Sequence, residues 1–233
     1  MENYLRRGVN AARYRAGRRV DRAAISRAHD VFYESDAWTR ATWLGVQALK
    51  NPLDLWVYQE IVFETRPELI VETGTYRGGS TLFLASICDL VGAGEVVSID
   101  IEPERDDYPR HPRITYLAGR SSTDPDVVNE VRERAAGAPI LVVLDSDHSQ
   151  AHVEAELEAY APLVPVGCYL IVEDSDIGQI RKDLMPGPLQ AVEAFLSGHD
   201  DFEIDREREK FLITSNPSGY LRRVRNASEH PTP

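Results

Sequence analysis

The sequence lacks the features that mark membrane, secreted and disulfide-rich proteins. No apolar run reaches the roughly 18 residues that cross a bilayer, and the first residues lack the apolar centre of a secretory signal. Two cysteines are present, Cys88 and Cys168, far apart in apolar stretches, which fits buried thiols in a reducing compartment better than a disulfide. We therefore expect a cytoplasmic protein with no membrane partner.

Positive charge is scarce as well. The 38 aspartates and glutamates outnumber the 26 lysines and arginines, which gives a formal net charge of −12. An acidic body disfavours a groove for nucleic acid, so we expect no nucleic-acid partner. Residues 1–27 are the exception, because they carry eight arginines. A phosphate or a membrane surface could bind them, although such stretches more often form a solvated helix face or contact a partner subunit.

The chain has 233 residues, of which 42% are hydrophobic, and this suits one domain with a sizeable core. Residues 1–50 are helical and irregular in pattern, so we assign them to an N-terminal helical extension that lines part of the binding pocket or contacts another subunit. Asn51 and Pro52 then give the start signal of a helix, an N-cap followed by proline. The main domain is predicted over 51–225, and 226–233 is expected to be disordered.

Beyond Pro67, short apolar runs alternate with helical segments. Runs that are apolar on both faces and separated by helices indicate a parallel sheet with helices on each side. We predict five such strands, at 69–73, 95–100, 113–119, 139–145 and 168–174.

The carboxyl-terminal part breaks this alternation. Two further runs, 201–205 and 210–215, are separated by only four residues, which is too short for a parallel crossover and therefore predicts an antiparallel hairpin. The expected fold is α/β and Rossmann-like, with a mostly parallel seven-stranded sheet that ends in an antiparallel hairpin. That arrangement is typical of class I methyltransferases rather than of dinucleotide-binding domains.

The segment VETGTYRGGS, residues 71–80, lies where the first predicted parallel strand passes into a helix. Ligands of open parallel sheets bind beyond the carboxyl ends of the strands, and glycines there allow close approach of the backbone. The spacing G-x-x-x-G-G differs from the dinucleotide fingerprint G-x-G-x-x-G. Glu72, just before the loop, would repel a diphosphate but suits a ligand with an ammonium group. Taken alone, Glu72 could also be a structural carboxylate that binds local amides.

S-adenosylmethionine fits this combination, because it joins an amino acid and a sulfonium to an adenosine. Asp100, at the end of the second strand, is placed to bind both ribose hydroxyls, and Ser80 begins the following helix, where the ligand carboxylate would lie. The serine-rich turn after the third strand is the expected place of adenine contacts. The predicted cofactor-binding residues are Glu72, Gly74, Thr75, Gly78, Ser80, Asp100, Ser121 and Ser122.

Three carboxylates end the fourth and fifth predicted strands, namely Asp145, Glu173 and Asp174. Neighbouring strands lie about 4.8 Å apart, so these groups can converge, and such a cluster is costly unless it holds a cation. Ligation by oxygen alone points to Mg²⁺, or to Mn²⁺ or Ca²⁺, rather than zinc. The alternative is that the acids cap helices and face solvent. Asp147 and Asp176 lie close enough in sequence to replace Asp145 or Asp174.

His148 follows Asp145 by three residues, which returns it to the same region at the start of a helix. An imidazole beside a metal-bound hydroxyl is suited to act as a general base, so His148 and Asp145 are the predicted catalytic residues. His152 lies one helical turn farther on, which leaves an H-x-x-x-H zinc pair as an alternative, although no glutamate follows His148 as in the metalloprotease motif. A surface histidine without a role is the other alternative.

These motifs resemble the cephalosporin hydroxylase family. The resemblance covers residues 42–176 and rests on the segment from Thr42 to Ser80 and on SID, LDSDH and LIVED downstream. Despite its name, that family is similar to S-adenosylmethionine- and Mg²⁺-dependent O-methyltransferases, and the metal and histidine segment also resembles bacterial macrolide-sugar and rhamnosyl O-methyltransferases. The resemblance implies homo-oligomers and a base at His148. It also implies a metal on Asp145, Glu173 and Asp174, and donor contacts by Glu72, Gly74, Ser80 and Asp100.

Methyl transfer to a hydroxyl of a sugar, in a glycoside, a polysaccharide precursor or a natural product, is the leading hypothesis. Mg²⁺ bound to two vicinal oxygens of the acceptor would lower the pKa of one hydroxyl, and alignment with the sulfonium would supply much of the remaining catalysis. A nicotinamide-dependent oxidoreductase and a non-catalytic nucleoside-binding module are the alternatives. A 2-oxoglutarate oxygenase is disfavoured, because it needs two histidines and a carboxylate, usually in an all-β barrel.

The segment 177–190 comes directly after the predicted metal ligands and is rich in glycine and proline. We expect it to form a mobile lid over the acceptor that excludes water from the reaction. A rigid crossover to the next helix is the alternative.

Overall fold

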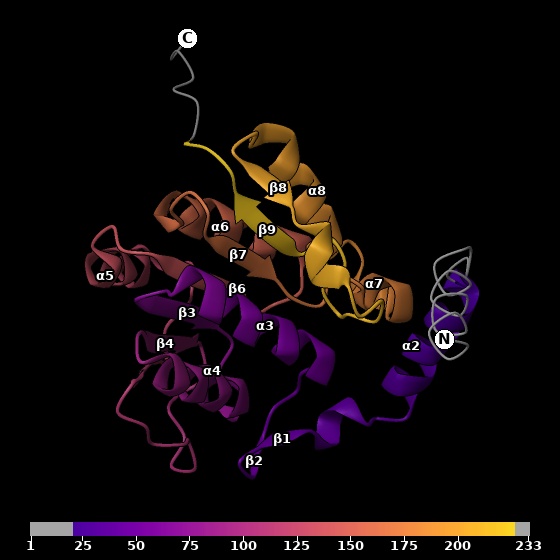
Figure 1. Cartoon of the computed structure of the whole chain (residues 1–233), viewed down its shortest axis with the longest axis horizontal. Coiled ribbons are helices and arrows are strands. Elements are labelled where there is room, and N and C mark those ends of the chain that lie inside the picture. Colours follow the sequence, from indigo (N-terminus) through magenta and orange to yellow (C-terminus); the bar gives the residue numbers. More distant parts are fainter. Residues whose placement is uncertain (1–20, 227–233) are drawn as a thin grey trace, which may run out of the picture.

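A twisted central sheet with helices on both faces forms the body of the molecule (Figure 1). The structure is a computed structural model and describes residues 21–226. The strands of this sheet are β3 (Leu69–Thr73), β4 (Glu95–Asp100), β5 (Ile114–Ala118), β6 (Ile140–Leu144), β7 (Tyr169–Val172), β8 (Phe202–Ile204) and β9 (Tyr220–Arg223).

The strand order is β5-β4-β3-β6-β7-β9-β8. The pairs among β3, β4, β5, β6 and β7 are parallel, and β9 is antiparallel to its neighbours β7 and β8. The expected fold class is therefore confirmed, including the antiparallel end of the sheet. The five predicted parallel strands all form, each within two residues of the expected ends.

The second strand of the predicted hairpin does not form where the sequence pattern put it. Residues 210–215 are turns and bends, and residues 205–219 as a whole connect β8 to β9. Leu212 is 53% exposed, whereas Tyr220 and Leu221 are fully buried and pair with β7. The run F-L-I-T-S has the residue types of a strand, but β propensity is weak and burial against the sheet decides which residues pair. The prediction of a strand at 210–215 was wrong.

Helices give the sheet two apolar cores, one on each face. Alternate residues of a strand point to opposite faces, so Val142 of β6 enters one core and its neighbour Leu141 enters the other. Strands buried on both faces are what their continuous apolar runs predicted. The first core is completed by α5 (Pro125–Ala135), α6 (Gln150–Tyr160) and α8 (Pro188–Gly198), and the second by α3 (Pro52–Thr65) and α4 (Gly79–Val91).

Local signals fix the ends of α3. The side chain of Asn51 accepts a hydrogen bond from the backbone nitrogen of Leu53 (3.0 Å), and Pro52 is the first helical residue. The helix ends at Arg66, which adopts the left-handed conformation with φ +48°. These are the N-cap and C-cap arrangements that satisfy terminal backbone groups. The predicted start of this helix is confirmed.

The N-terminal part of the described chain is a helix followed by a short hairpin. The indole nitrogen of Trp43 donates a hydrogen bond to Ser86 of α4 (3.0 Å), so the hairpin packs on a helix that covers the sheet. α2 lies apart from the sheet, beside α7, as Figure 1 shows. α2 falls within the helical extension expected over residues 1–50, whereas the hairpin was not predicted. The elements are α2 (Arg22–Glu34), η1 (Trp38–Arg40), β1 (Thr42–Trp43), β2 (Val46–Gln47) and α7 (Ile177–Ile180).

Most of the arginine-rich start, residues 1–20, and the end of the chain, residues 227–233, lie outside the described residues. The expectations for these two segments are therefore carried by the sequence alone. Between residues 21 and 226, every helix is too short or too polar to cross a membrane.

Candidate functional site

A cavity of about 970 Å³ opens at the carboxyl ends of the parallel strands. Its wall includes residues that follow β3, β4, β6 and β7, among them Gly74, Asp100, Asp145 and Glu173. The chain adds strands on one side of β3 first and then, from β6, on the other side. Open α/β sheets bind ligands at this reversal. The volume lies at the upper end of the roughly 300–1,000 Å³ usual for small-molecule sites and suits two ligands together.

Two glycines of the loop after β3 have steric roles. Gly74 has φ +85°, and a Cβ atom there would lie 2.0 Å from the backbone oxygen of Asp145. Gly78 has φ +77°, and its Cβ atom would lie 2.8 Å from Pro109. Both positions therefore require glycine. Part of the reason for the glycines is contact between the protein's own loops, in addition to the approach of a ligand.

Asp100, at the end of β4, binds the backbone of the glycine loop. Its Oδ2 accepts hydrogen bonds from the backbone nitrogens of Thr75 (2.8 Å) and Tyr76 (3.0 Å), and its Oδ1 accepts one from Glu102 (2.9 Å). A carboxylate has about four lone-pair sites. Asp100 therefore shapes the loop and still has acceptor capacity for ligand hydroxyls at the cavity wall.

Glu72 is fully buried at the end of β3. Its Oε2 accepts hydrogen bonds from the hydroxyls of Thr81 (2.5 Å) and Ser98 (2.8 Å). Burial raises the pKa of Glu72, and the charge of Lys50 opposes that rise. Within the described chain, Oε1 of Glu72 has no hydrogen-bond partner. The hydroxyl of Ser80 also acts on this carboxylate and lowers its pKa, so the carboxylate has a weak local partner and Oε1 has room for a further donor.

The structure divides the predicted cofactor-binding residues into two groups. Ser122 is typical of the first, since it lines the cavity and its Oγ lies 3.3 Å from Nε2 of His152. Thr75 is typical of the second, since its hydroxyl is buried against Ser98 (2.7 Å). Gly74, Asp100, Ser121 and Ser122 form part of the cavity wall, whereas Glu72, Thr75, Gly78 and Ser80 do not line it.

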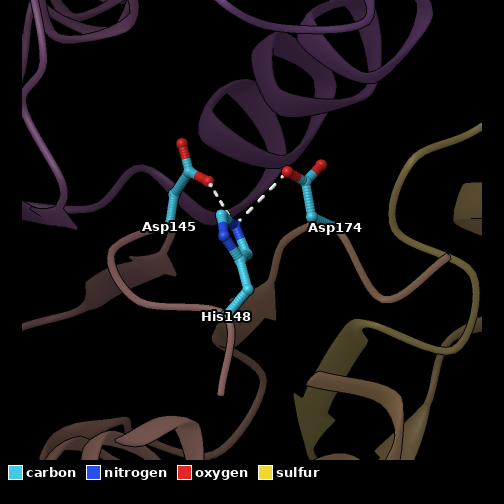
Figure 2. A group of neighbouring side chains, drawn as sticks. All are labelled: Asp145, His148 and Asp174. Carbon is cyan, nitrogen blue, oxygen red and sulfur yellow. Dashed lines mark ion pairs between the residues drawn. The ribbon is translucent and has the colours of Figure 1, made fainter. Parts of the chain in front are cut away.

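Asp145, His148 and Asp174 converge at the cavity wall, and Figure 2 shows the imidazole between the two carboxylates. Nε2 of His148 lies 3.4 Å from Oδ1 of Asp145 and 3.3 Å from Oδ2 of Asp174. These contacts are ion pairs without hydrogen-bond geometry. The potential ligand atoms of Asp145, His148 and Asp174 all lie within 4.8 Å of one another, so one ion could contact all three residues. The two acids come from the ends of the adjacent strands β6 and β7.

Glu173, the third predicted carboxylate, faces a lysine that sequence reasoning missed. Nζ of Lys50 lies 2.7 Å from Oε1 of Glu173 and also contacts Oδ2 of Asp145, and only 4% of the lysine side chain is exposed. Tyr58 donates a second hydrogen bond to Oε1 of Glu173 (2.8 Å). The one signal in the sequence is the position of Lys50 at the end of the apolar stretch TWLGVQALKN, next to a helix N-cap.

Burial and charge compensation set the protonation of this cluster. Burial raises the pKa of Glu173 well above its usual range, and the charge of Asp145 adds to the rise. Burial acts in the same direction on Asp145, but Lys50 and His148 outweigh it and lower the pKa of Asp145. Burial disfavours a charged ring at His148, yet Asp145 and Asp174 outweigh it and raise the pKa of His148 to about 10. The positive charges of Lys50 and His148 thus offset the negative charge of the acid cluster.

The cluster fits a divalent cation. Asp145 and Asp174 lie on either side of the His148 ring and raise its pKa, so the space between the two carboxylates favours positive charge. Carboxylates from two strand ends supply the oxygen ligands that Mg²⁺ and Mn²⁺ prefer. The two acids considered as substitutes have other partners. Asp147 accepts a hydrogen bond from the backbone nitrogen of Ser149 (2.7 Å), and Asp176 pairs with His29 (2.7 Å).

His152 belongs to a different cluster. Its Nε2 lies 3.0 Å from the hydroxyl of Ser146 and 3.4 Å from Oε1 of Glu156, which is fully buried. In the part of the chain from 21 to 226, the one group of side chains spaced to hold a metal consists of Asp145, His148 and Asp174. The structure therefore gives no support to a zinc pair of His148 and His152.

The N-terminal extension supplies one wall of the cavity. His29, Phe32 and Tyr33 of α2 and Trp38 of η1 line it. The rings of Tyr33 and Trp38 are stacked, with centroids 5.4 Å apart and planes inclined by 16°. The contact of His29 with Asp176 holds α2 beside the acid cluster. An aromatic surface therefore lies on the side of the cavity away from the glycine loop.

The strand order, the antiparallel end of the sheet and the cavity at the point of reversal define a class I S-adenosylmethionine-dependent methyltransferase. The chain belongs to the Rhamnosyl O-methyltransferase/CmcI family, whose model matches residues 35–224. The resemblance and the enzyme class expected from the sequence, an S-adenosylmethionine-dependent O-methyltransferase, are thereby confirmed.

Relatives of known name agree with this assignment. A rhamnosyl O-methyltransferase of Mycobacterium bovis is 37% identical over 207 residues, which cover 85% of this chain and 83% of the relative. A solved structure of CmcI with Mg and SAM matches with a TM-score of 0.61 and 25% identity, over 80% of this chain and 78% of that one. MycE, solved with Mg, SAH and mycinamycin VI, shares the fold, with a TM-score of 0.52 and 16% identity over 76% of this chain and 50% of that one. The cofactors expected from the sequence are those bound in these related structures.

Proposed function

We propose that this protein transfers the methyl group of S-adenosylmethionine to a hydroxyl of a sugar, with a divalent cation held at the ends of β6 and β7. The observation that carries the proposal is one cavity that joins the glycine loop at Gly74 and Asp100 to the acid cluster at Asp145 and Asp174. Methyl transfer needs two ligands side by side, and a cavity of about 970 Å³ accommodates them. The rhamnosyl O-methyltransferases among the relatives support a sugar as acceptor.

The donor would lie over the carboxyl ends of β3 and β4. Asp100 would accept hydrogen bonds from both ribose hydroxyls, and Ser121 and Ser122 would contact the adenine. Glu72 would attract the ammonium group, a role that the room for a further donor at its Oε1 supports. The start of α4, at Ser80, offers backbone N–H groups to the donor carboxylate.

Asp145, Glu173 and Asp174 would hold Mg²⁺ or Mn²⁺ through oxygen ligands. Such an ion, when bound, supplies a positive charge that binds two vicinal acceptor oxygens and lowers the pKa of one hydroxyl. The side chains of Asp145 and Asp174 are 20% and 37% exposed, against 5% for Glu173. All three acids line the cavity, but Asp145 and Asp174 are the more exposed, and Glu173 would bind the ion from the side where Lys50 lies.

His148 would take the proton from the acceptor hydroxyl. Its ring cannot accept a proton while Asp145 and Asp174 keep it charged. The negative charge of those two carboxylates would be offset by a bound divalent cation. The interactions that raise the pKa of His148 would then weaken, and the ring would become neutral. A neutral imidazole at this place is a suitable general base.

The acceptor would bind between the acid cluster and the wall made by α2 and η1. Aromatic side chains such as Tyr33 and Trp38 offer flat apolar surfaces against which the CH groups of a sugar ring can pack. The segment 177–190, with α7 and the 3₁₀ turn η3 (Lys182–Leu184), follows the acid cluster, and Ile177 lines the cavity. We retain the proposal that this segment is a lid over the acceptor. The homo-oligomer and the cytoplasmic location stay predictions.

The test is transfer of a labelled methyl group from S-adenosylmethionine to a panel of methyl glycosides, rhamnosides included, with Mg²⁺ and after treatment with EDTA. We expect a methylated product from at least one sugar, loss of turnover in EDTA and recovery with Mg²⁺ or Mn²⁺. Full turnover in a metal-free preparation would refute the metal site. Calorimetric binding of S-adenosylhomocysteine without transfer to any hydroxyl compound would favour the non-catalytic nucleoside-binding module.

A further inference from the structure

One buried asparagine is linked to both acids that follow β7, to one directly and to the other through a tyrosine. Asn216 lies in the connection between β8 and β9 and is fully buried. Its Oδ1 accepts a hydrogen bond from the backbone nitrogen of Asp174 (3.1 Å), and its Nδ2 donates to the hydroxyl of Tyr58 (2.9 Å). Tyr58 in turn donates to Oε1 of Glu173 (2.8 Å). A single amide therefore holds the backbone of one acid directly and the side chain of the other through a phenol.

The backbone of Asp174 adopts a conformation that needs such support. Its φ is +51°, in the left-handed region that side chains other than glycine rarely adopt. Both acids line the cavity, but 37% of the side chain of Asp174 is exposed after this turn, against 5% for Glu173. A strained backbone persists only where the surrounding structure over-determines it. The hydrogen bond to Asn216 is part of that surrounding structure.

The segment that carries Asn216 is itself fastened to the body of the protein. Asp54, in the first turn of α3, accepts hydrogen bonds from the hydroxyl of Thr214 (2.6 Å) and the backbone nitrogen of Ser215 (2.9 Å). On the other side of Asn216, Gly219 packs so closely on β7 that a Cβ atom would lie 2.1 Å from the backbone oxygen of Val172. Asn216 therefore acts from a fixed base.

The directions of the hydrogen bonds make the amide hard to replace. An amide side chain accepts through oxygen and donates through nitrogen, whereas an aspartate only accepts and an alanine does neither. Because Asn216 donates to the Tyr58 oxygen, the hydrogen of Tyr58 is free to point at Glu173. Asn216 and Tyr58 are each 1% exposed or less, so water cannot replace the hydrogen bond between them.

We propose that Asn216 and Tyr58 are positioning residues: Asn216 fixes the backbone of Asp174, and Tyr58 fixes the side chain of Glu173, the two neighbouring acids that the proposed function assigns to one divalent cation. This inference rests on the proposed function, since it concerns the same metal site. Neither residue lines the cavity. Partners that orient metal ligands are typically worth about 10–100-fold in metal affinity or activity.

The experiment measures Mn²⁺ binding by electron paramagnetic resonance in the full-length protein, in Asn216→Ala and in Tyr58→Phe. Tyr169→Phe is the matched control, because Tyr169 is also a buried residue (2% exposed) whose hydroxyl donates to a carboxylate, Asp205 (2.6 Å), at the opposite end of β7. We expect Mn²⁺ affinity to fall about tenfold in Tyr58→Phe and about 10–100-fold in Asn216→Ala. It should stay at the wild-type value in Tyr169→Phe. Binding of S-adenosylhomocysteine should be unchanged in all three variants.

A merely structural role is separated from positioning by the metal dependence of turnover. In the positioning role, turnover of Tyr58→Phe recovers at saturating Mn²⁺, so the loss appears in the metal requirement rather than in kcat. Tyr58→Phe keeps the ring and carries the test if Asn216→Ala does not fold. Wild-type Mn²⁺ affinity in Tyr58→Phe would overturn the inference, and so would an equal loss in Tyr169→Phe. A wild-type protein that binds S-adenosylhomocysteine but no Mn²⁺ would instead refute the proposed metal site itself.

Discussion

Lys50 and His148 bind opposite oxygens of one carboxylate. Lys50 contacts Oδ2 of Asp145, and His148 lies 3.4 Å from Oδ1. The lysine is nearly inaccessible to solvent, while 27% of the histidine side chain is exposed at the cavity. At the scale of the residue, Asp145 is therefore shared between a permanent internal cation and a group that can change its charge. The two positions call for different experiments.

Replacement of Lys50 should act on stability. In Lys50→Met the carboxylates of Asp145 and Glu173 lose their buried cation, and breaking a buried ion pair from one side costs about 3–5 kcal/mol. Urea unfolding monitored by circular dichroism should show a loss of that order. Lys210→Met is the control, because its ion pair with Glu60 is exposed and such pairs contribute about 0–1 kcal/mol. Equal losses in the two variants would contradict the claim that the buried ion pairs of Lys50 contribute more to stability than the exposed pair of Lys210.

Replacement of His148 should act on turnover. His148→Ala removes the proposed base and should lower kcat by about 10²–10⁴-fold, while the affinity for S-adenosylhomocysteine stays unchanged. Raising the pH should partly restore turnover, because the acceptor hydroxyl can then lose its proton to solvent. His152→Ala provides the comparison, since its ring contacts Ser146 and Glu156 instead. Loss of turnover in His152→Ala together with normal turnover in His148→Ala would show that the base is misassigned.

At the scale of the element, α3 connects the acid cluster to the end of the chain. Asp54 and Tyr58 are four residues apart and therefore lie on the same face of the helix. Asp54 binds the connection at Thr214 and Ser215, and Tyr58 binds Glu173. The helix thus sets the distance between the β8–β9 connection and the ends of the parallel strands.

Asp54 should give the stability of the protein a distinctive dependence on pH. Burial raises the pKa of Asp54 from 3.8 to about 6, against the hydrogen bonds from Thr214, Ser215 and Tyr220 that favour its charged form. Because the folded state holds this proton more tightly than the unfolded chain, the contribution of Asp54 to stability is largest below about pH 4 and is lost as the pH rises through 6. The full loss is about 3 kcal/mol.

Urea unfolding of the wild type and of Asp54→Asn at several pH values measures this contribution. The difference between their free energies of unfolding should shift by about 1 kcal/mol between pH 5 and pH 7 in the direction that disfavours the wild type at the higher pH. A difference that stays constant over that interval would mean that Asp54 titrates in the folded state as it does in the unfolded chain.

At the scale of the whole molecule, the cavity lies between two groups of strands. Gly74 belongs to the group of β3, β4 and β5, and Asp145 to the group of β6, β7, β9 and β8. A ligand bound there contacts both groups and should stabilise the protein as a unit. At about 100 times its Kd, S-adenosylhomocysteine should add about 2.7 kcal/mol to the free energy of unfolding. Thermal denaturation should show the shift with and without EDTA, and NAD should produce none.

The sequence predicted what depends on local pattern and missed what depends on distant contacts. The parallel strands and the start of α3 were foreseen because continuous apolar runs and an Asn-Pro signal are local. The residue types of 210–215 predict a strand, but Tyr220 and Leu221 occupy that place in the sheet. Lys50 escaped notice because its partners, Asp145 and Glu173, lie far along the chain. Asp145 and Asp174 could be paired because parallel strand ends meet at one edge.

The position of α2 outside the sheet bears on how the acceptor specificity of the protein can evolve. The donor loop and the acid cluster are built on the ends of strands, whose side chains fill both cores. Phe32, Tyr33 and Trp38 come from a segment outside the sheet, yet they line the same cavity. If the acceptor binds as proposed, substitutions of these aromatic residues would alter the shape offered to it without disturbing the cores. New acceptor preferences would then arise by drift in residues 32–38, and the same stretch would be the target for engineering them.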